Sequence, residues 1–152
     1  MTNAAIIADS SPLISLAIVE QLELLPQLYQ QVLASPAVWD EVTVQGAGLP
    51  GAQVVRQLTW LTIQAPEPKM LEPLSILIDR GEAEAIALAQ SIPDSTVLLD
   101  DAQARRVAER LGVRPFLTPY SSGKLSGSTP SDQSPELLVE TPRRLWIALD
   151  RI

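Results

Sequence analysis

Residues 4–12, AAIIADSSP, decide the fold, because an apolar run leads directly into Asp9, two serines and a proline. A short apolar run bounded by turn residues predicts a buried strand, and a hydroxyl residue followed by proline predicts the start of a helix. The same signal recurs at Ser35-Pro36, directly after a second strand candidate at residues 31–34. Strand, cap and helix therefore follow one another twice near the N-terminus.

The rest of the regular structure alternates in the same way. Periodicity and turn residues predict further strands at residues 61–63 and 96–99 and further helices at residues 52–58, 82–90 and 102–111. This order predicts an α/β fold, a three-layer α/β/α sandwich with a mostly parallel central sheet. Ligands of such a sheet bind outside the carboxyl ends of its strands, where Asp9, Asp100 and Asp101 fall.

The sequence changes character at Arg114. Residues 114–141 are rich in Pro, Ser, Thr and Gly, a composition that predicts a loop. Thr141-Pro142 then repeats the cap-and-proline signal and predicts a C-terminal helix over residues 142–152. With 152 residues, of which 46% are hydrophobic, we expect one domain over residues 1–152, with residues 114–141 as a divergent segment.

The composition excludes several kinds of chemistry. The chain contains no His and no Cys, which excludes disulfides, zinc fingers, thiol nucleophiles and Ser-His-Asp triads. Its 11 Lys and Arg against 18 Asp and Glu give 11 − 18 = −7, a charge that disfavours nucleic-acid binding through a broad basic face. A bound cation inverts the local field, so this charge is compatible with an enzyme that reaches phosphates through a metal ion.

No membrane segment is expected. The apolar stretch at residues 4–19 has no preceding basic region and is interrupted by Asp9, so it differs from a signal sequence. No other apolar run is long enough to span a bilayer. The sequence therefore predicts a soluble, cytoplasmic protein.

Carboxylates stand at four places where a folded α/β domain can bring them together. They are Asp9, Glu41, Glu82 and the pair Asp100-Asp101. Hard divalent cations prefer oxygen ligands, so these side chains predict a site for Mg²⁺ or Mn²⁺. Such an ion lowers the pKa of bound water and offsets phosphate charge, so cleavage of a phosphodiester would need no protein nucleophile.

Each of these carboxylates also has a purely structural interpretation. Asp9 can serve as a local acceptor for the turn into the helix, and Glu41 can lie on a solvated helix face. Glu82 and Glu84 lie roughly 200° apart around a helix, so both cannot face one site. Glu82 lies in the first turn, where the helix dipole favours an anion, so Glu82 is favoured over Glu84 as the site residue.

The Asp100-Asp101 pair leads into a helix with two arginines. If the pair is extended, one aspartate faces the ions while the other caps the helix. Arg105 and Arg106 can reach a scissile phosphate or bridge to the site carboxylates. Pairing with Glu109 on the same helix is favoured over these contacts, because such surface ion pairs are common.

Four sequence blocks together resemble the PIN-domain superfamily, in its branch of uncharacterised prokaryotic proteins related to VapC-like toxins. The blocks are IIADSSPLISL, AVWDEV about thirty residues later, RGEAEAIALAQ and LLDDAQARRVAERLGV, and the resemblance covers roughly residues 4–113. It implies a PIN-like α/β/α sandwich with a parallel sheet and a ribonuclease that depends on Mg²⁺ or Mn²⁺. It also implies frequent homodimers and, often, a cognate antitoxin protein.

The resemblance also implies roles for individual residues. The family's catalytic acidic quartet matches Asp9, Glu41, Glu82 and Asp101, and these four with the neighbouring Asp100 are the expected metal ligands. Ser10 matches a hydroxyl that contacts phosphate or a metal-bound water. Arg105 is the second expected substrate contact because of its position on the helix after the Asp pair, and not because of the resemblance.

The match ends after Val113. Members of this branch continue with a Gly-rich turn, a short strand and a helix that bears an Ala-Lys pair and a glycine. Residues 114–133 contain no such pattern, and Lys124, between Gly123 and Leu125, is no convincing substitute for the pair.

Three functions are compatible with these observations. The leading hypothesis is a metal-dependent endoribonuclease, the toxin of a toxin–antitoxin pair, which cuts RNA to leave a 5′-phosphate and a 3′-hydroxyl. A PIN-like scaffold without catalysis, acting through protein association, is favoured by the divergent tail and the net charge of −7. A metal-dependent phosphatase for small phosphate esters is a third hypothesis, which the same carboxylates permit.

Overall fold

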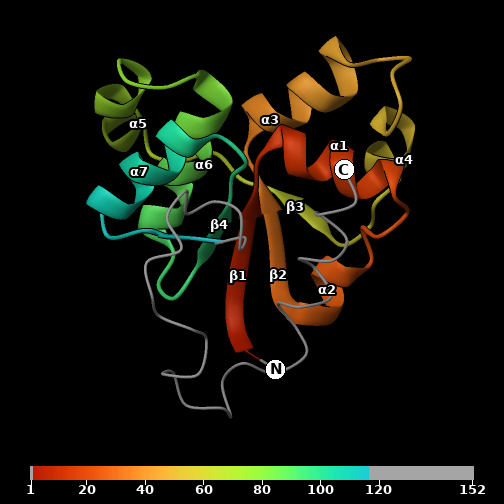
Figure 1. The fold of residues 1–152 in the computed structure, drawn as a ribbon, viewed down its shortest axis with the longest axis horizontal. Coiled ribbons are helices and arrows are strands. Elements are labelled where there is room, and N and C mark those ends of the chain that lie inside the picture. The colour runs from red at the N-terminus through yellow and green to blue at the C-terminus, as the bar shows by residue number, and fades with distance from the viewer. Residues whose placement is uncertain (1, 117–152) are drawn as a thin grey trace, which may run out of the picture.

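The protein forms a five-stranded, all-parallel sheet with helices on both of its faces (Figure 1). The computed structural model describes residues 2–116, so the predicted C-terminal helix and most of the divergent segment lie outside the described residues. The strand order is β3-β2-β1-β4-β5. The predicted α/β/α sandwich with a parallel sheet is confirmed.

In chain order the elements are β1 Thr2–Ala8, α1 Ser10–Ile18, α2 Leu24–Leu28, β2 Tyr29–Ala34, α3 Pro36–Asp40, the π-helix η1 Glu41–Gln45, α4 Ala52–Arg56, β3 Leu61–Ile63, α5 Pro68–Ser75, α6 Arg80–Ser91, β4 Thr96–Leu98, α7 Ala102–Arg110 and β5 Arg114–Pro115. None of the helices in this part of the chain has the length and apolar character needed to cross a membrane.

Each face of the sheet has its own apolar core, because successive residues of β1 point to opposite faces. Ile6 and Ala8 pack with side chains from α1, α2, α3, η1 and α4. Ala5 and Ile7 pack with side chains from α5, α6 and α7. Burial of an Ile side chain contributes about 1.5–3 kcal/mol, so the apolar run of β1 stabilises it at the centre of the sheet.

The direction in which the chain builds the sheet reverses beside β1. The chain first places β2 and β3 on one side of β1 and then crosses over to place β4 and β5 on the other. The register sets Ile7 against Leu33 of β2 and against Val97 of β4. In open parallel sheets such a reversal leaves a crevice at the carboxyl ends of the two strands, which is where ligands bind.

The helix predicted after Ser35 changes its geometry part-way along. Ser35 caps α3 as expected, because its Oγ accepts a hydrogen bond from the Val38 N–H at 3.2 Å. Beyond Asp40 the chain continues as η1, where the Gly46 N–H donates to the Glu41 carbonyl at 2.9 Å. Short π-helices are frequent at functional sites, and here the π-helix begins at Glu41, one of the predicted ligands.

Two elements were not predicted from the sequence. Pro66 and Pro68 are typical of turns, but Pro68 occupies the start of α5, where proline is tolerated, and Leu74 anchors the helix in the core. Gly112, with φ of +73°, ends α7, and the chain then pairs Arg114 with Thr96. The prediction of a loop from Arg114 onward is therefore wrong at this edge strand.

Replacing Gly46 with alanine should destabilise the fold by about 1–3 kcal/mol. The new Cβ would lie 2.6 Å from the Val42 carbonyl oxygen, which cannot move without disturbing η1. Urea unfolding followed by circular dichroism measures the loss. Ala47→Gly, at the exposed neighbouring position, is the control and should cost less than about 1 kcal/mol. Equal midpoints for Gly46→Ala and the native chain would contradict the prediction.

Candidate active site

Asp9 lies at the carboxyl end of β1, at the point where the order of strands reverses. Its backbone N–H donates to the Leu98 carbonyl of β4 at 3.1 Å, which fixes the Asp9 backbone at the end of β1 beside β4. Asp9 is 4% exposed, its side chain does not cap α1, and its Oδ1 has no partner among the described residues. Ser10, the predicted hydroxyl contact, is buried beside it at the first position of α1. The Asp9 side chain is therefore not a helix cap, and the local backbone group that acts on it is that of Ser10.

The surroundings of Asp9 disfavour its ionised form. Its pKa is raised to about 6, chiefly by burial. A hydrogen bond from the Ser10 backbone opposes the rise, whereas the charges of Glu41, Asp100 and Asp79 add to it. A buried carboxylate that faces other carboxylates is stabilised by a bound cation or by a proton.

Glu41 and Asp9 converge over Gly81, at the start of α6. A Cβ built on Gly81 would lie 3.1 Å from Oε2 of Glu41 and 3.4 Å from Oδ1 of Asp9. Glu41 reaches this point from η1, and Asp9 from the end of β1. Because glycine has no side chain, a small space stays open between the two carboxylates and α6.

Glu82 follows in the first turn of α6 and belongs to the same acidic group. Its pKa is raised to about 7, first by burial and then by the charges of Asp9, Asp101 and Asp79. These three aspartates come from β1, from the N-cap of α7 and from the residue before α6. The fold therefore gathers carboxylates from distant parts of the chain at one edge of the sheet.

Glu84 has a structural role instead. Its Oε2 accepts a hydrogen bond from the Ala37 N–H at 2.9 Å, and its Oε1 lies 3.4 Å from Nε of Arg80. It therefore ties α6 to the first turn of α3. This arrangement agrees with the expectation that only one of Glu82 and Glu84 faces the site.

The two adjacent aspartates after β4 have different surroundings. Oδ2 of Asp101 accepts a hydrogen bond from the Ala104 N–H at 2.8 Å and thereby caps α7. Asp100 is exposed, and its charge acts on Asp9, whereas the charge of Asp101 acts on Glu82. Because one oxygen of Asp101 serves the cap, Asp100 has the greater freedom to bind a ligand.

Asp79 joins the group and was missed by the sequence analysis. It is exposed directly before α6, and its charge raises the pKa of both Asp9 and Glu82. With Glu41 and Gly81 it lines a hollow of about 540 Å³. The sequence did contain a signal for Asp79, which stands two residues before Gly81. A residue directly before a helix lies at the same end of that helix as its first turn, where Glu82 was expected.

Arg105 supports the loop after β4. Its guanidinium donates to the carbonyls of Leu99 at 3.2 Å and Asp100 at 2.6 Å. Among residues 5–116, neither Arg105 nor Arg106 forms the favoured ion pair with Glu109, so that prediction is wrong. The carbonyls at the end of β4 offer Arg105 acceptors at the start of its own helix, which draw it away from Glu109.

A sequence model described as a PIN domain matches residues 5–116. The chain belongs to the PIN-domain family. The resemblance of the four blocks to the PIN-domain superfamily is thus confirmed, and the matched span reaches from β1 through β5. PIN domains are generally nucleases, which gives the acidic group at the sheet edge a chemical context. No curated protein matches the chain.

The acidic group of this PIN domain fits a hard divalent cation. Among the described residues, no three His, Cys, Asp or Glu side chains already form a metal site. However, Mg²⁺ keeps several waters and needs only one or two carboxylates from the protein. Asp9 and Glu41 meet this requirement, because they offer only oxygen donors and flank the space over Gly81. The unpartnered Oδ1 of Asp9 is the donor that such an ion would satisfy.

The raised pKa values of Asp9 and Glu82 predict that the metal-free PIN domain becomes less stable to unfolding as the pH rises. Between about pH 4 and 7 the folded chain keeps protons on Asp9 and Glu82 that the unfolded chain has released, so their contribution to stability is lost through this range. Asp9→Asn stays uncharged and should be more stable than the native chain at pH 7.5 by about 3 kcal/mol. Thermal unfolding in a chelator measures the difference, which should vanish near pH 4. A difference that grows as the pH falls would contradict this assignment.

Proposed function

We propose that this PIN domain is an endoribonuclease that depends on Mg²⁺ or Mn²⁺. The observation that carries the proposal is the buried carboxylate of Asp9. Its Oδ1 has no hydrogen-bond partner within the described part of the chain and lies with Glu41 over Gly81. The other expected ligands stand at the same edge of the sheet. They are Glu82, Asp100 and Asp101.

The proposed reaction is hydrolysis of an RNA phosphodiester that leaves a 5′-phosphate and a 3′-hydroxyl. When bound, the divalent cation would offset phosphate charge and lower the pKa of water. Asp9 and Glu41 would hold the cation at the crevice. Glu82, whose pKa is raised to about 7, is able to take up or release a proton at neutral pH, as a general acid or base must. Arg105 would keep the Asp100 segment in position.

Single-stranded RNA incubated with the protein and Mn²⁺ should be cut, and Asp9→Asn should reduce the rate by at least about 100-fold. Product ends are identified by their susceptibility to phosphatase and ligase treatment. Chelation of Mn²⁺ should stop the reaction and its re-addition should restore it. Native activity in Asp9→Asn would refute the proposal.

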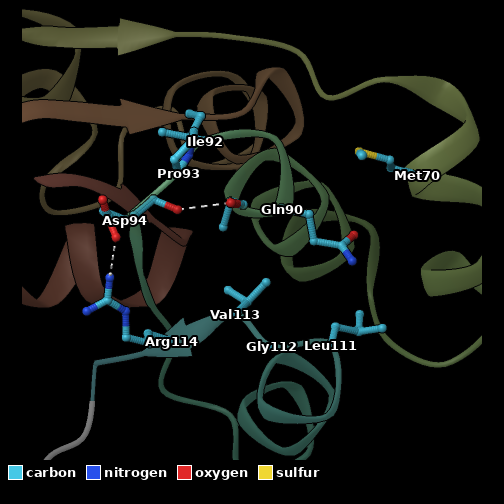
Figure 2. A pocket seen from close by; sticks show the side chains of 11 residues that line it. Met70, Gln90, Ile92, Pro93, Asp94, Leu111, Gly112, Val113 and Arg114 are labelled. Atoms are coloured by element: carbon cyan, nitrogen blue, oxygen red, sulfur yellow. Dashed lines mark hydrogen bonds and ion pairs between the residues drawn. The ribbon is translucent and has the colours of Figure 1, made fainter.

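The matched control is Asp94→Asn, the same change at the opposite end of the sheet. Asp94 lines a separate hollow of about 400 Å³ and lies 3.4 Å from Arg114 (Figure 2). Its φ of +57° suits asparagine as well as aspartate, and the ion pair is exposed, so stability should change little. Asp94→Asn should therefore cut RNA at the native rate.

Gly81→Ala should separate cation binding from folding. The added methyl group would occupy the space between Glu41 and Asp9, so Mn²⁺ affinity measured by calorimetry should fall about tenfold or more. Because alanine favours a helix over glycine by about 1 kcal/mol, the metal-free melting temperature should not decrease. Native Mn²⁺ affinity in this variant would contradict the placement of the ion.

We also propose that the nuclease is the toxin of a toxin–antitoxin pair and acts in the cytoplasm as a homodimer. The support is the resemblance of the four sequence blocks to VapC-like toxins. A scaffold that acts through protein association is the second candidate, which the exposed apolar side chains of Ile18, Val44 and Leu49 favour. Failure of the native chain to take up Mn²⁺, together with a stable oligomer, would favour the scaffold.

A further inference from the structure

A hollow beside the acidic group contains one cationic side chain among several carboxylates. Asp40, Glu41, Asp79, Arg80 and Gly81 contribute to its walls, and its volume is about 540 Å³. Glu41 and Gly81 also border the space that the unpartnered oxygen of Asp9 faces. The hollow therefore adjoins the candidate active site and shares Glu41 and Gly81 with it.

Arg80 is anchored but still exposed. Its Nε lies 3.4 Å from Oε1 of Glu84, a buried carboxylate that is itself fixed by the Ala37 N–H. The Arg80 side chain is nevertheless 79% exposed. Within residues 5–116 its two terminal nitrogens have no hydrogen-bond partner, so they are free to contact a ligand in the hollow.

Three other arginines already have hydrogen-bond or ion-pair partners. Arg105 donates to two backbone carbonyls and Arg56 donates to the Thr43 carbonyl. Arg114 pairs with Asp94 at the far end of the sheet. Arg105 also lies at this edge, but the carbonyls of Leu99 and Asp100 occupy its guanidinium. Arg80 is a cation at the acidic group whose terminal nitrogens have no hydrogen-bond partner among residues 5–116.

We propose that Arg80 binds a phosphate of the RNA strand next to the scissile phosphate. This inference rests on the proposed nuclease function. A chain with a net charge of −7 repels RNA, so a local positive group is needed to hold the strand beside the carboxylates. A guanidinium held at Nε presents its two terminal nitrogens in one plane, which suits the paired oxygens of a phosphate. The ion pair with Glu84 pre-orients that plane and so reduces the entropy lost on binding.

The test measures binding of a fluorescein-labelled single-stranded RNA by anisotropy at several salt concentrations. All variants carry Asp9→Asn, so that the RNA stays intact. Arg80→Ala should weaken binding about fivefold and lower the slope of log affinity against log salt by about 0.7, the value for one lost contact to a single strand. Arg80→Lys keeps the charge and should retain most of the slope.

Arg110→Ala is the matched control, because it removes the same charge at the last residue of α7, at the other end of that helix from Asp101. It should leave the slope and the affinity near the native values. Equal effects of Arg80→Ala and Arg110→Ala, or an unchanged slope in Arg80→Ala, would overturn the proposal.

Two further measurements separate this proposal from a structural role and from the nuclease proposal. Mn²⁺ affinity of Arg80→Ala, measured with native Asp9, should be unchanged or higher, because a nearby positive charge is removed. Loss of Mn²⁺ binding would show that Arg80 organises the carboxylates and would overturn phosphate binding. Absence of RNA cleavage by the native chain would refute the nuclease function, whereas the salt slopes test Arg80 without any cleavage.

Discussion

The buried carboxylate of Asp9 is the constraint on which the site depends. Taking a negative charge out of water is unfavourable, and at this position other carboxylates add to the cost. The position is nevertheless held firmly, because the apolar residues before Asp9 fill both cores and its own N–H is bound to β4. The fold thus holds the Asp9 backbone in a place where an ionised carboxylate is unfavourable. A bound cation would relieve the cost of burying this charge beside other carboxylates.

The remaining carboxylates reach Asp9 because parallel strands and their following helices all direct the same ends to one edge. Asp100 follows β4 just as Asp9 follows β1, and Glu82 lies in the first turn of α6. Glu41 arrives by another route, since it begins a π-helix whose closure requires the close backbone approach that Gly46 permits. Two glycines therefore shape the site, Gly46 by allowing the turn and Gly81 by leaving room between the carboxylates.

Much of this arrangement could be predicted from local sequence. The run into Asp9, the cap at Ser35 and the strand before Asp100 are local signals, and strand order then places their ends together. What the sequence did not predict depends on interactions between distant residues. β5 forms because Gly112 turns the chain back to β4, and Arg105 is held by carbonyls that only a finished strand end presents. Helical periodicity also cannot distinguish η1 from an α-helix, because the difference appears in hydrogen bonding rather than in the spacing of apolar residues.

The hydrogen bond between Asp9 and Leu98 joins the beginning of the domain to a strand near the end of the described chain. Pairing across so long a stretch of sequence requires the intervening chain to be synthesised first, and closing so long a loop slows folding. While the polypeptide is still being translated, the N-terminal half contains Asp9 and Glu41 but neither α6 nor the aspartates after β4. For the nuclease proposed here, this order of synthesis would leave the acidic group incomplete until α6 and α7 have been made.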